Sequence, residues 1–164
     1  MKKVVFFMLF TTIIVSLFIS CAKNTKTELT VEQKAAIQNE VKDQYHKALS
    51  AINQLNSVSW FEFWSKDGFL TAFSGVNYFD NRSALIDTVA NWFSNRTSQK
   101  FEPVDILVTP LTPELALLTS KMDYEILFKN ENQYKFKGLH TLIWKKEQTG
   151  WKIIHMHESY EGNN

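Results

Sequence analysis

The sequence predicts an α+β fold in which helices cover one face of a curved antiparallel sheet. Up to about residue 94, apolar residues recur mostly every three or four positions, whereas from Gln99 onward they alternate with polar residues. The first spacing is typical of helices that pack on a core, and the second is typical of strands. Helices followed by a run of closely connected strands indicate helices packed against one side of an antiparallel meander.

A long first helix is predicted to begin after Thr30. Thr30 is followed three residues later by Gln33, which is the pattern of a capping box. Beyond it, apolar side chains recur at spacings of three or four and form one stripe: Ile37, Val41, Tyr45, Ala48, Ile52 and Leu55. We therefore expect a single amphipathic helix whose stripe faces the sheet.

Two shorter helices and one strand are predicted to follow. The aromatic segment from Ser57 to Trp64 is typical of a short helix packed into the core, closed near Gly68. Residues 69–73 indicate a first strand that ends near Gly75. The pair Asp80-Asn81 then indicates a turn into a third helix, over residues 82–94.

Four strands are predicted for the rest of the chain, over residues 101–108 and 115–128 and in a hairpin over residues 133–160. The segment from Pro110 to Pro113 breaks the first two strands apart, and residues 129–132 form a hairpin turn. A meander of this kind, covered by helices, forms a cone whose mouth can hold a small ligand.

The last strand carries the candidate site. Trp151, Ile153, His155, His157 and Ser159 follow each other at two-residue spacing, which predicts that they share one face and form a pocket wall. The neighbouring strand contributes a residue opposite His157. A type I turn with a bulge at Gly150 places Thr141 there, whereas a two- or four-residue loop places His140 there.

Three chemistries are compatible with this face, to which Tyr45 and Tyr124 would add pocket-lining side chains. In one, His155 or His157 works with Asp123 as a general acid and base, because imidazole titrates near neutral pH. A metal site would need a third ligand beside the two histidines, so no metal and no other cofactor is assigned. The favoured interpretation is a pocket that binds without reacting.

The N-terminus predicts a lipoprotein. Lys2 and Lys3 precede an apolar run from Val4 to Ile19, and Cys21 is the only cysteine. This pattern resembles a bacterial lipobox, although Phe18 stands where leucine is usual. We expect a signal peptide over residues 1–20, a lipidated Cys21 with a tether over residues 21–29, and one domain over residues 30–164. The expected location is the cell envelope, at the outer membrane facing the periplasm. The near-neutral charge gives no case for nucleic-acid binding.

The segment from Gly150 to Ser159, together with Thr141-Leu-Ile-Trp144, resembles the closing strands of the NTF2-like (cystatin-like cone) superfamily. The chain is most similar to its SnoaL-like branch, and also to the association domain of calcium/calmodulin-dependent protein kinase type II. Asp67-Gly68 and the helix entry at residues 81–85 support the resemblance, which spans residues 33–160.

The resemblance implies a cone fold, a pocket between helices and concave sheet, and a homodimer formed through the sheet. It is compatible with an envelope lipoprotein that binds a small, largely apolar or aromatic molecule. The alternative is a small cofactor-free isomerase, dehydratase or cyclase that uses pocket His and Asp residues. The kinase association domain carries arginines on its inner strands, where this chain has Leu142 and Glu158, so an arginine clamp for a carboxylate ligand is disfavoured.

Overall fold

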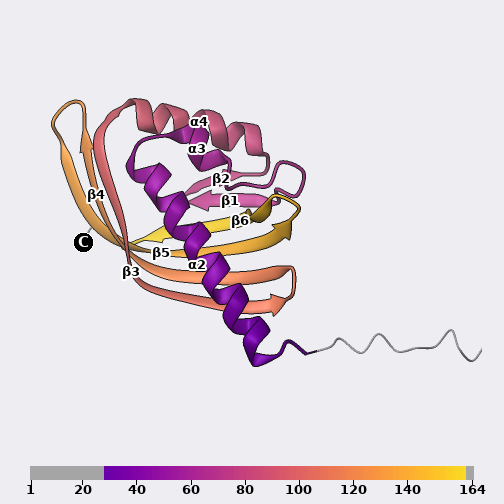
Figure 1. Cartoon of the computed structure of the whole chain (residues 1–164). Helices are drawn as coiled ribbons and strands as arrows, with labels where there is room; N and C mark the ends of the chain where they lie inside the picture. The colour runs from indigo at the N-terminus through magenta and orange to yellow at the C-terminus, as the bar shows by residue number, and fades with distance from the viewer. Residues whose placement is uncertain (1–27, 162–164) are drawn as a thin grey trace, which may run out of the picture.

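The computed structural model describes residues 28–161, and in it a six-stranded sheet curves around one long helix (Figure 1). The strand order is β2-β1-β6-β5-β4-β3. The predicted α+β class, with one long and two short helices, is confirmed. The elements are α2 Val31–Asn53, α3 Ser57–Phe61, β1 Thr71–Ser74, β2 Asn77–Phe79, α4 Arg82–Ser94, β3 Arg96–Thr112, β4 Leu115–Phe128, β5 Gln133–Glu147 and β6 Gly150–Tyr160. The predicted signal peptide and Cys21 lie outside the described residues.

Helix α2 runs across the concave face of the sheet (Figure 1). Its predicted capping box is present, because the Thr30 hydroxyl accepts from the Gln33 amide at 3.2 Å and the Thr30 amide donates to the Gln33 side chain at 2.9 Å. The Asn53 side chain then joins the end of the helix to β3: it accepts from the Phe101 N–H at 2.7 Å and donates to the Phe101 carbonyl at 3.2 Å. Helix and sheet are thus held in a defined register around the core. The buried residues of the predicted stripe are Ile37, Val41, Tyr45, Ala48 and Ile52.

The aromatic segment after α2 lies in the core, as predicted. Trp60, Phe61 and Trp64 are buried, and the rings of Trp60 and Trp64 meet edge to face with centroids 5.4 Å apart. Helix α4 has the predicted bounds, and its Asn81 N-cap side chain accepts from the Ala84 amide at 2.8 Å.

The sheet differs from the prediction in three places. It is mixed, because β1 pairs with β6 in parallel. A further short strand, β2, pairs antiparallel with β1 across the turn at Gly75, whose φ is +59°. Strand β3 is also longer at both ends than the predicted 101–108, because it begins at Arg96 and continues through Pro110 to Thr112. A proline is tolerated there because β3 is an edge strand of the sheet. Edge strands accept proline, since a backbone N–H that points to the open side makes no hydrogen bond to a neighbouring strand.

A β-bulge in β6 decides the register of the last hairpin. Next to the turn, Glu147 pairs with Gly150 and Trp144 pairs with Ile153, a register that would place His140 opposite His157 if it continued. Instead, Ile143 pairs with His155, so Ile154 is an extra residue and Thr141 lies opposite His157.

The bulge also reverses which side chains of β6 face the core. A one-residue slip moves every following side chain to the other face. Trp151 and Ile153 face the concave side and are buried, whereas His155, His157 and Ser159 face the convex side. The prediction that these five residues share one face is therefore wrong. Beyond the bulge, the strand directs Met156, Glu158 and Tyr160 toward the helices.

Candidate functional site

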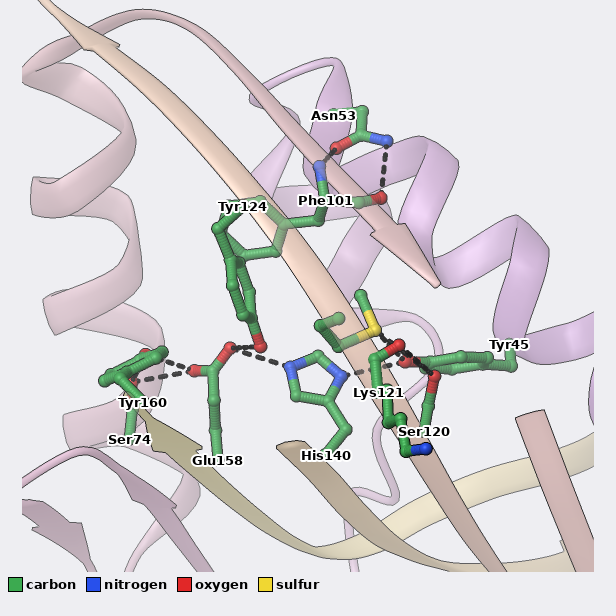
Figure 2. A network of polar contacts seen from close by, with 11 residues as sticks. Tyr45, Asn53, Ser74, Phe101, Ser120, Lys121, Tyr124, His140, Glu158 and Tyr160 are labelled. Carbon is green, nitrogen blue, oxygen red and sulfur yellow. Dashed lines mark hydrogen bonds and ion pairs between the residues drawn. The ribbon is translucent and has the colours of Figure 1, made fainter. Parts of the chain in front are cut away.

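A buried carboxylate, that of Glu158, forms the centre of the concave face. Only 6% of the residue is exposed. Its Oε1 accepts from His140 Nε2 at 2.7 Å and from the Tyr124 hydroxyl at 2.8 Å. Its Oε2 accepts from the Tyr160 hydroxyl at 2.6 Å and from the Ser74 hydroxyl at 2.9 Å (Figure 2). Four strands, β1, β4, β5 and β6, thus contribute to one polar cluster.

Glu158 is ionised at neutral pH. Burial alone would raise the pKa of this carboxyl, but the charge and hydrogen bond of His140 and the Tyr160 and Tyr124 hydroxyls lower it to about 2. Burial and the nearby Glu158 charge both raise the pKa of Tyr124 and of Tyr160. Both phenols therefore remain protonated and serve as donors to the carboxylate.

Both ring nitrogens of His140 have hydrogen-bond partners inside the protein. Its Nδ1 lies 2.8 Å from the Tyr45 hydroxyl, which is also 3.1 Å from the Met122 sulfur. When the imidazole is neutral, Tyr45 donates to Nδ1. When the imidazole is protonated, Nδ1–H donates to Tyr45, whose own proton turns to the sulfur. Burial raises the pKa of Tyr45, so this hydroxyl keeps its proton in both arrangements.

A cleft lies between this cluster and the helices. Its inner chamber has a volume of about 50 Å³, with His140 and Glu158 at its polar end. It adjoins an outer mouth of about 720 Å³. Both parts are lined by Ser74, Trp92, Arg96, Phe101 and Tyr160. The remaining walls of the inner chamber are mainly apolar: Ile52, Trp60, Leu85, Val89, Phe93 and Met156.

The structure brings three of the sequence-predicted site residues together at Glu158. Tyr124 and His140 bond to its carboxylate, and Tyr45 supports the far side of the imidazole. Trp151 also faces inward, but its indole N–H donates to Glu40 of α2 at 2.7 Å, and the residue lines neither part of the cleft.

The other predicted residues face away from the cleft. His155 bonds through Nδ1 to the Thr71 hydroxyl at 2.7 Å, and burial together with His157 lowers its pKa. His157 is exposed, and Thr141 lies opposite it. The expected pairing of these histidines with Asp123 inside a pocket is therefore corrected: Asp123 is exposed and lies opposite Lys137 in the sheet. Ser159 lines a groove on the convex face with Asp123 and Leu139.

Four residues of the site were not predicted from the sequence: Glu158, Ser74, Tyr160 and Arg96. One signal was available: Ile153 and Ile154 are adjacent apolar residues in an otherwise alternating strand, which indicates a change of face. The prediction that disfavoured an arginine clamp considered the inner strands only. Arg96 lines the cleft from the start of β3 instead.

Two further findings concern residues 28–161 only. In that part of the chain, no three histidine, cysteine or acidic side chains gather in a way that could hold a metal ion. None of its helices combines the length and the apolar character needed to cross a membrane.

The chain is similar to a known domain family in sequence and to several solved proteins in structure. The model of the SnoaL-like domain matches residues 39–161. An NTF2-like superfamily protein from Salmonella enterica is similar in structure at a TM-score of 0.72 and 12% identity, covering 79% of this chain and 94% of that one. A candidate scytalone dehydratase from Novosphingobium aromaticivorans has a TM-score of 0.74 at 10% identity, with 81% and 89% covered.

A third similar structure is a candidate calcium/calmodulin-dependent protein kinase II association domain from Xanthomonas campestris. Its TM-score is 0.66 at 16% identity, covering 76% of this chain and 89% of that one. No curated protein matches the chain in sequence. At these identities the structural likenesses show a shared fold.

Proposed function

Since this chain belongs to the SnoaL-like domain family of the NTF2-like superfamily, we propose that its cleft binds a small, largely apolar or aromatic molecule. The observation that carries the proposal is the cleft, whose two adjoining parts have apolar and aromatic walls and a polar inner end. Clefts of this composition, with a few polar groups that fix orientation, are typical of small-molecule sites.

The two parts of the cleft suit different parts of a ligand. The inner chamber has room only for a small group, whereas the outer mouth can hold a ring system beside Trp92 and Phe101. At the polar end, both oxygens of Glu158 and both nitrogens of His140 already have protein partners. Such a saturated cluster supports binding rather than proton transfer as the primary activity.

We expect native mass spectrometry of the gently purified full chain to show a bound organic molecule that denaturation releases. Phe101→Ala should weaken its binding at least tenfold, because it removes an aromatic wall shared by both parts of the cleft. Leu107→Ala, on the same strand at a position 62% exposed, is the control and should leave binding unchanged. An empty chain that also binds none of a panel of aromatic compounds would contradict the proposal.

A second candidate function is acid–base catalysis, in an isomerase, dehydratase or cyclase. The His140–Glu158 pair favours it, because a buried carboxylate orients the imidazole. Candidate dehydratases are among the proteins of similar fold. In this candidate function, Glu158 is the carboxylate partner of the histidine, in place of the predicted Asp123. Turnover of a bound compound that His140→Gln abolishes without loss of binding would support it; a ligand recovered chemically unchanged would count against it.

We also propose that the protein is an envelope lipoprotein, anchored through Cys21 and facing the periplasm from the outer membrane. The support is the lipobox-like sequence before Cys21. Cys21→Ser should leave the protein unprocessed or release it from the membrane fraction, because the acylated thiol is lost. Unchanged fractionation, with processing insensitive to globomycin, would refute the anchor.

We also propose that the protein forms a homodimer through the convex face of the sheet. That face carries exposed Val104 and Leu139, which line a groove of about 460 Å³. Exposed apolar side chains grouped on one face favour a protein contact. The native mass measurement described above reports the assembly directly, and a monomer at micromolar concentration would exclude a stable dimer.

A further inference from the structure

Arg96 occupies an unusual position in the cleft. It is the first residue of β3, directly after the last turn of α4, and it lines both the inner chamber and the outer mouth. The residue is partly buried, and burial lowers its pKa while Tyr160 and Glu158 raise it. Arginine nevertheless remains charged in proteins at physiological pH. The cleft therefore contains a permanent positive charge at the junction of its two parts.

The partners of this guanidinium leave most of its donors unused. Nη1 donates to the side chain of Gln99, and no other hydrogen bond of the guanidinium is found among residues 28–161. Its Nε is buried without a hydrogen-bond partner. The rings of Phe93 and Phe128 lie 6.0 and 5.9 Å from the guanidinium carbon. These contacts hold the side chain against aromatic surface without neutralising its charge.

No carboxylate within residues 28–161 forms an ion pair with Arg96. Glu158, across the chamber, has its oxygens occupied by four other donors. By contrast, Lys135, a second cation that lines the outer mouth, is paired with Glu125 at 3.2 Å. Of these two cations, Arg96 is the one without an ion-pair partner in the described part of the chain and is therefore available to a ligand.

We propose that Arg96 is the anchor for a carboxylate, so that the ligand of the cleft is an aromatic or otherwise apolar carboxylic acid. The planar guanidinium suits a carboxylate because it can donate two parallel hydrogen bonds, and partial burial strengthens them. The Ser74 and Tyr160 hydroxyls line the same junction, but their protons are already donated to Glu158, so the guanidinium is the donor that remains for a carboxylate. This inference rests on the proposed function of the cleft and names the chemical class that it accepts.

The test compares acids with neutral analogues of the same shape. The full chain, purified in detergent, is titrated by calorimetry with 1-naphthoate and 1-naphthalenemethanol, and with benzoate and benzyl alcohol as a smaller pair. We expect each acid to bind at least tenfold more tightly than its alcohol. Arg96→Gln should remove this preference while leaving the affinity for the alcohols unchanged.

Two variants complete the design. Arg82→Gln is the matched control, because Arg82 also has a buried, unpartnered Nε but lines neither part of the cleft. It should keep the preference for acids. Arg96→Lys retains the charge without the two-pronged donor geometry, so it should keep only part of the preference, and it serves if Arg96→Gln does not fold.

The outcomes separate this inference from the proposed function. If acids and alcohols bind equally, or if the preference survives in Arg96→Gln, the carboxylate anchor is refuted while the binding function stands. If the folded chain binds neither member of either pair, both proposals are refuted for aromatic ligands.

Discussion

Replacing Glu158 by glutamine is expected to lower the free energy of unfolding by about 3 kcal/mol, because it removes a buried charge that accepts hydrogen bonds from four donors. Glutamine has the same shape but retains only one acceptor oxygen. Its amide would place two N–H groups against side chains that now donate to the carboxylate, including either Tyr124 or Tyr160. Urea denaturation at pH 7 measures the loss.

The control for this variant is Asp123→Asn, which neutralises an exposed acid on the convex face. Substitutions at such positions usually change stability by less than about 0.5 kcal/mol. Equal losses in Glu158→Gln and Asp123→Asn would show that the buried cluster contributes no more than a surface charge.

The Glu158→Gln variant also tests how the stability of the fold depends on pH. The pKa of Glu158 is lowered from 4.5 in the unfolded chain to about 2 in the folded protein. A depressed carboxyl pKa stabilises the fold above the unfolded value, and this contribution is lost as the pH falls through the folded value. The stability difference between the natural protein and Glu158→Gln should therefore shrink between about pH 4.5 and pH 2. A difference that stays constant over this range would contradict the ionised state.

Gly138→Ala is expected to destabilise the protein by about 2–3 kcal/mol, because the concave face has no room for a methyl group at this position. A Cβ atom there would lie 2.3 Å from the Ser159 carbonyl oxygen, 3.0 Å from the Tyr124 ring and 3.3 Å from the Tyr160 ring. The first contact is with backbone, so β5 and β6 would have to separate. The two tyrosines donate to Glu158, so the polar cluster would be displaced as well.

Thermal unfolding of Gly138→Ala beside Lys137→Ala provides the comparison. Lys137 is the preceding residue, is exposed and lies opposite Asp123, so its loss should shift the melting temperature little. A Gly138→Ala melting temperature as high as that of the control would mean that the strands adjust without cost.

Much of the fold could be predicted from the sequence because its signals are local. The capping box at Thr30 and the apolar stripe of α2 specify the long helix through contacts within a few residues. The bounds of α4 follow in the same way from the Asn81 cap. The resemblance of the last two strands also indicated the correct family, because the model of the SnoaL-like domain matches residues 39–161.

The site could be predicted only in part, because it depends on which face each side chain takes. His140, Tyr124 and Tyr45 lie at the polar cluster, but the two histidines of β6 do not. One extra residue at Ile154 directs His155 and His157 to the convex side and directs Glu158 into the core. A β-bulge adds one residue to the strand, so residues at two-residue spacing on either side of it point to opposite faces.

By itself, the sequence determined the helices, the strand-rich second half and the SnoaL-like family, because periodicity, capping and the closing-strand motif are encoded by residues close together along the chain. Only the tertiary structure decided the bulge in β6, the parallel pairing of β1 with β6 and the approach of Arg96 to the cleft. These features arise from pairing between segments far apart in the sequence. Their energies depend on how the strands and helices pack together, which no short stretch of residues specifies.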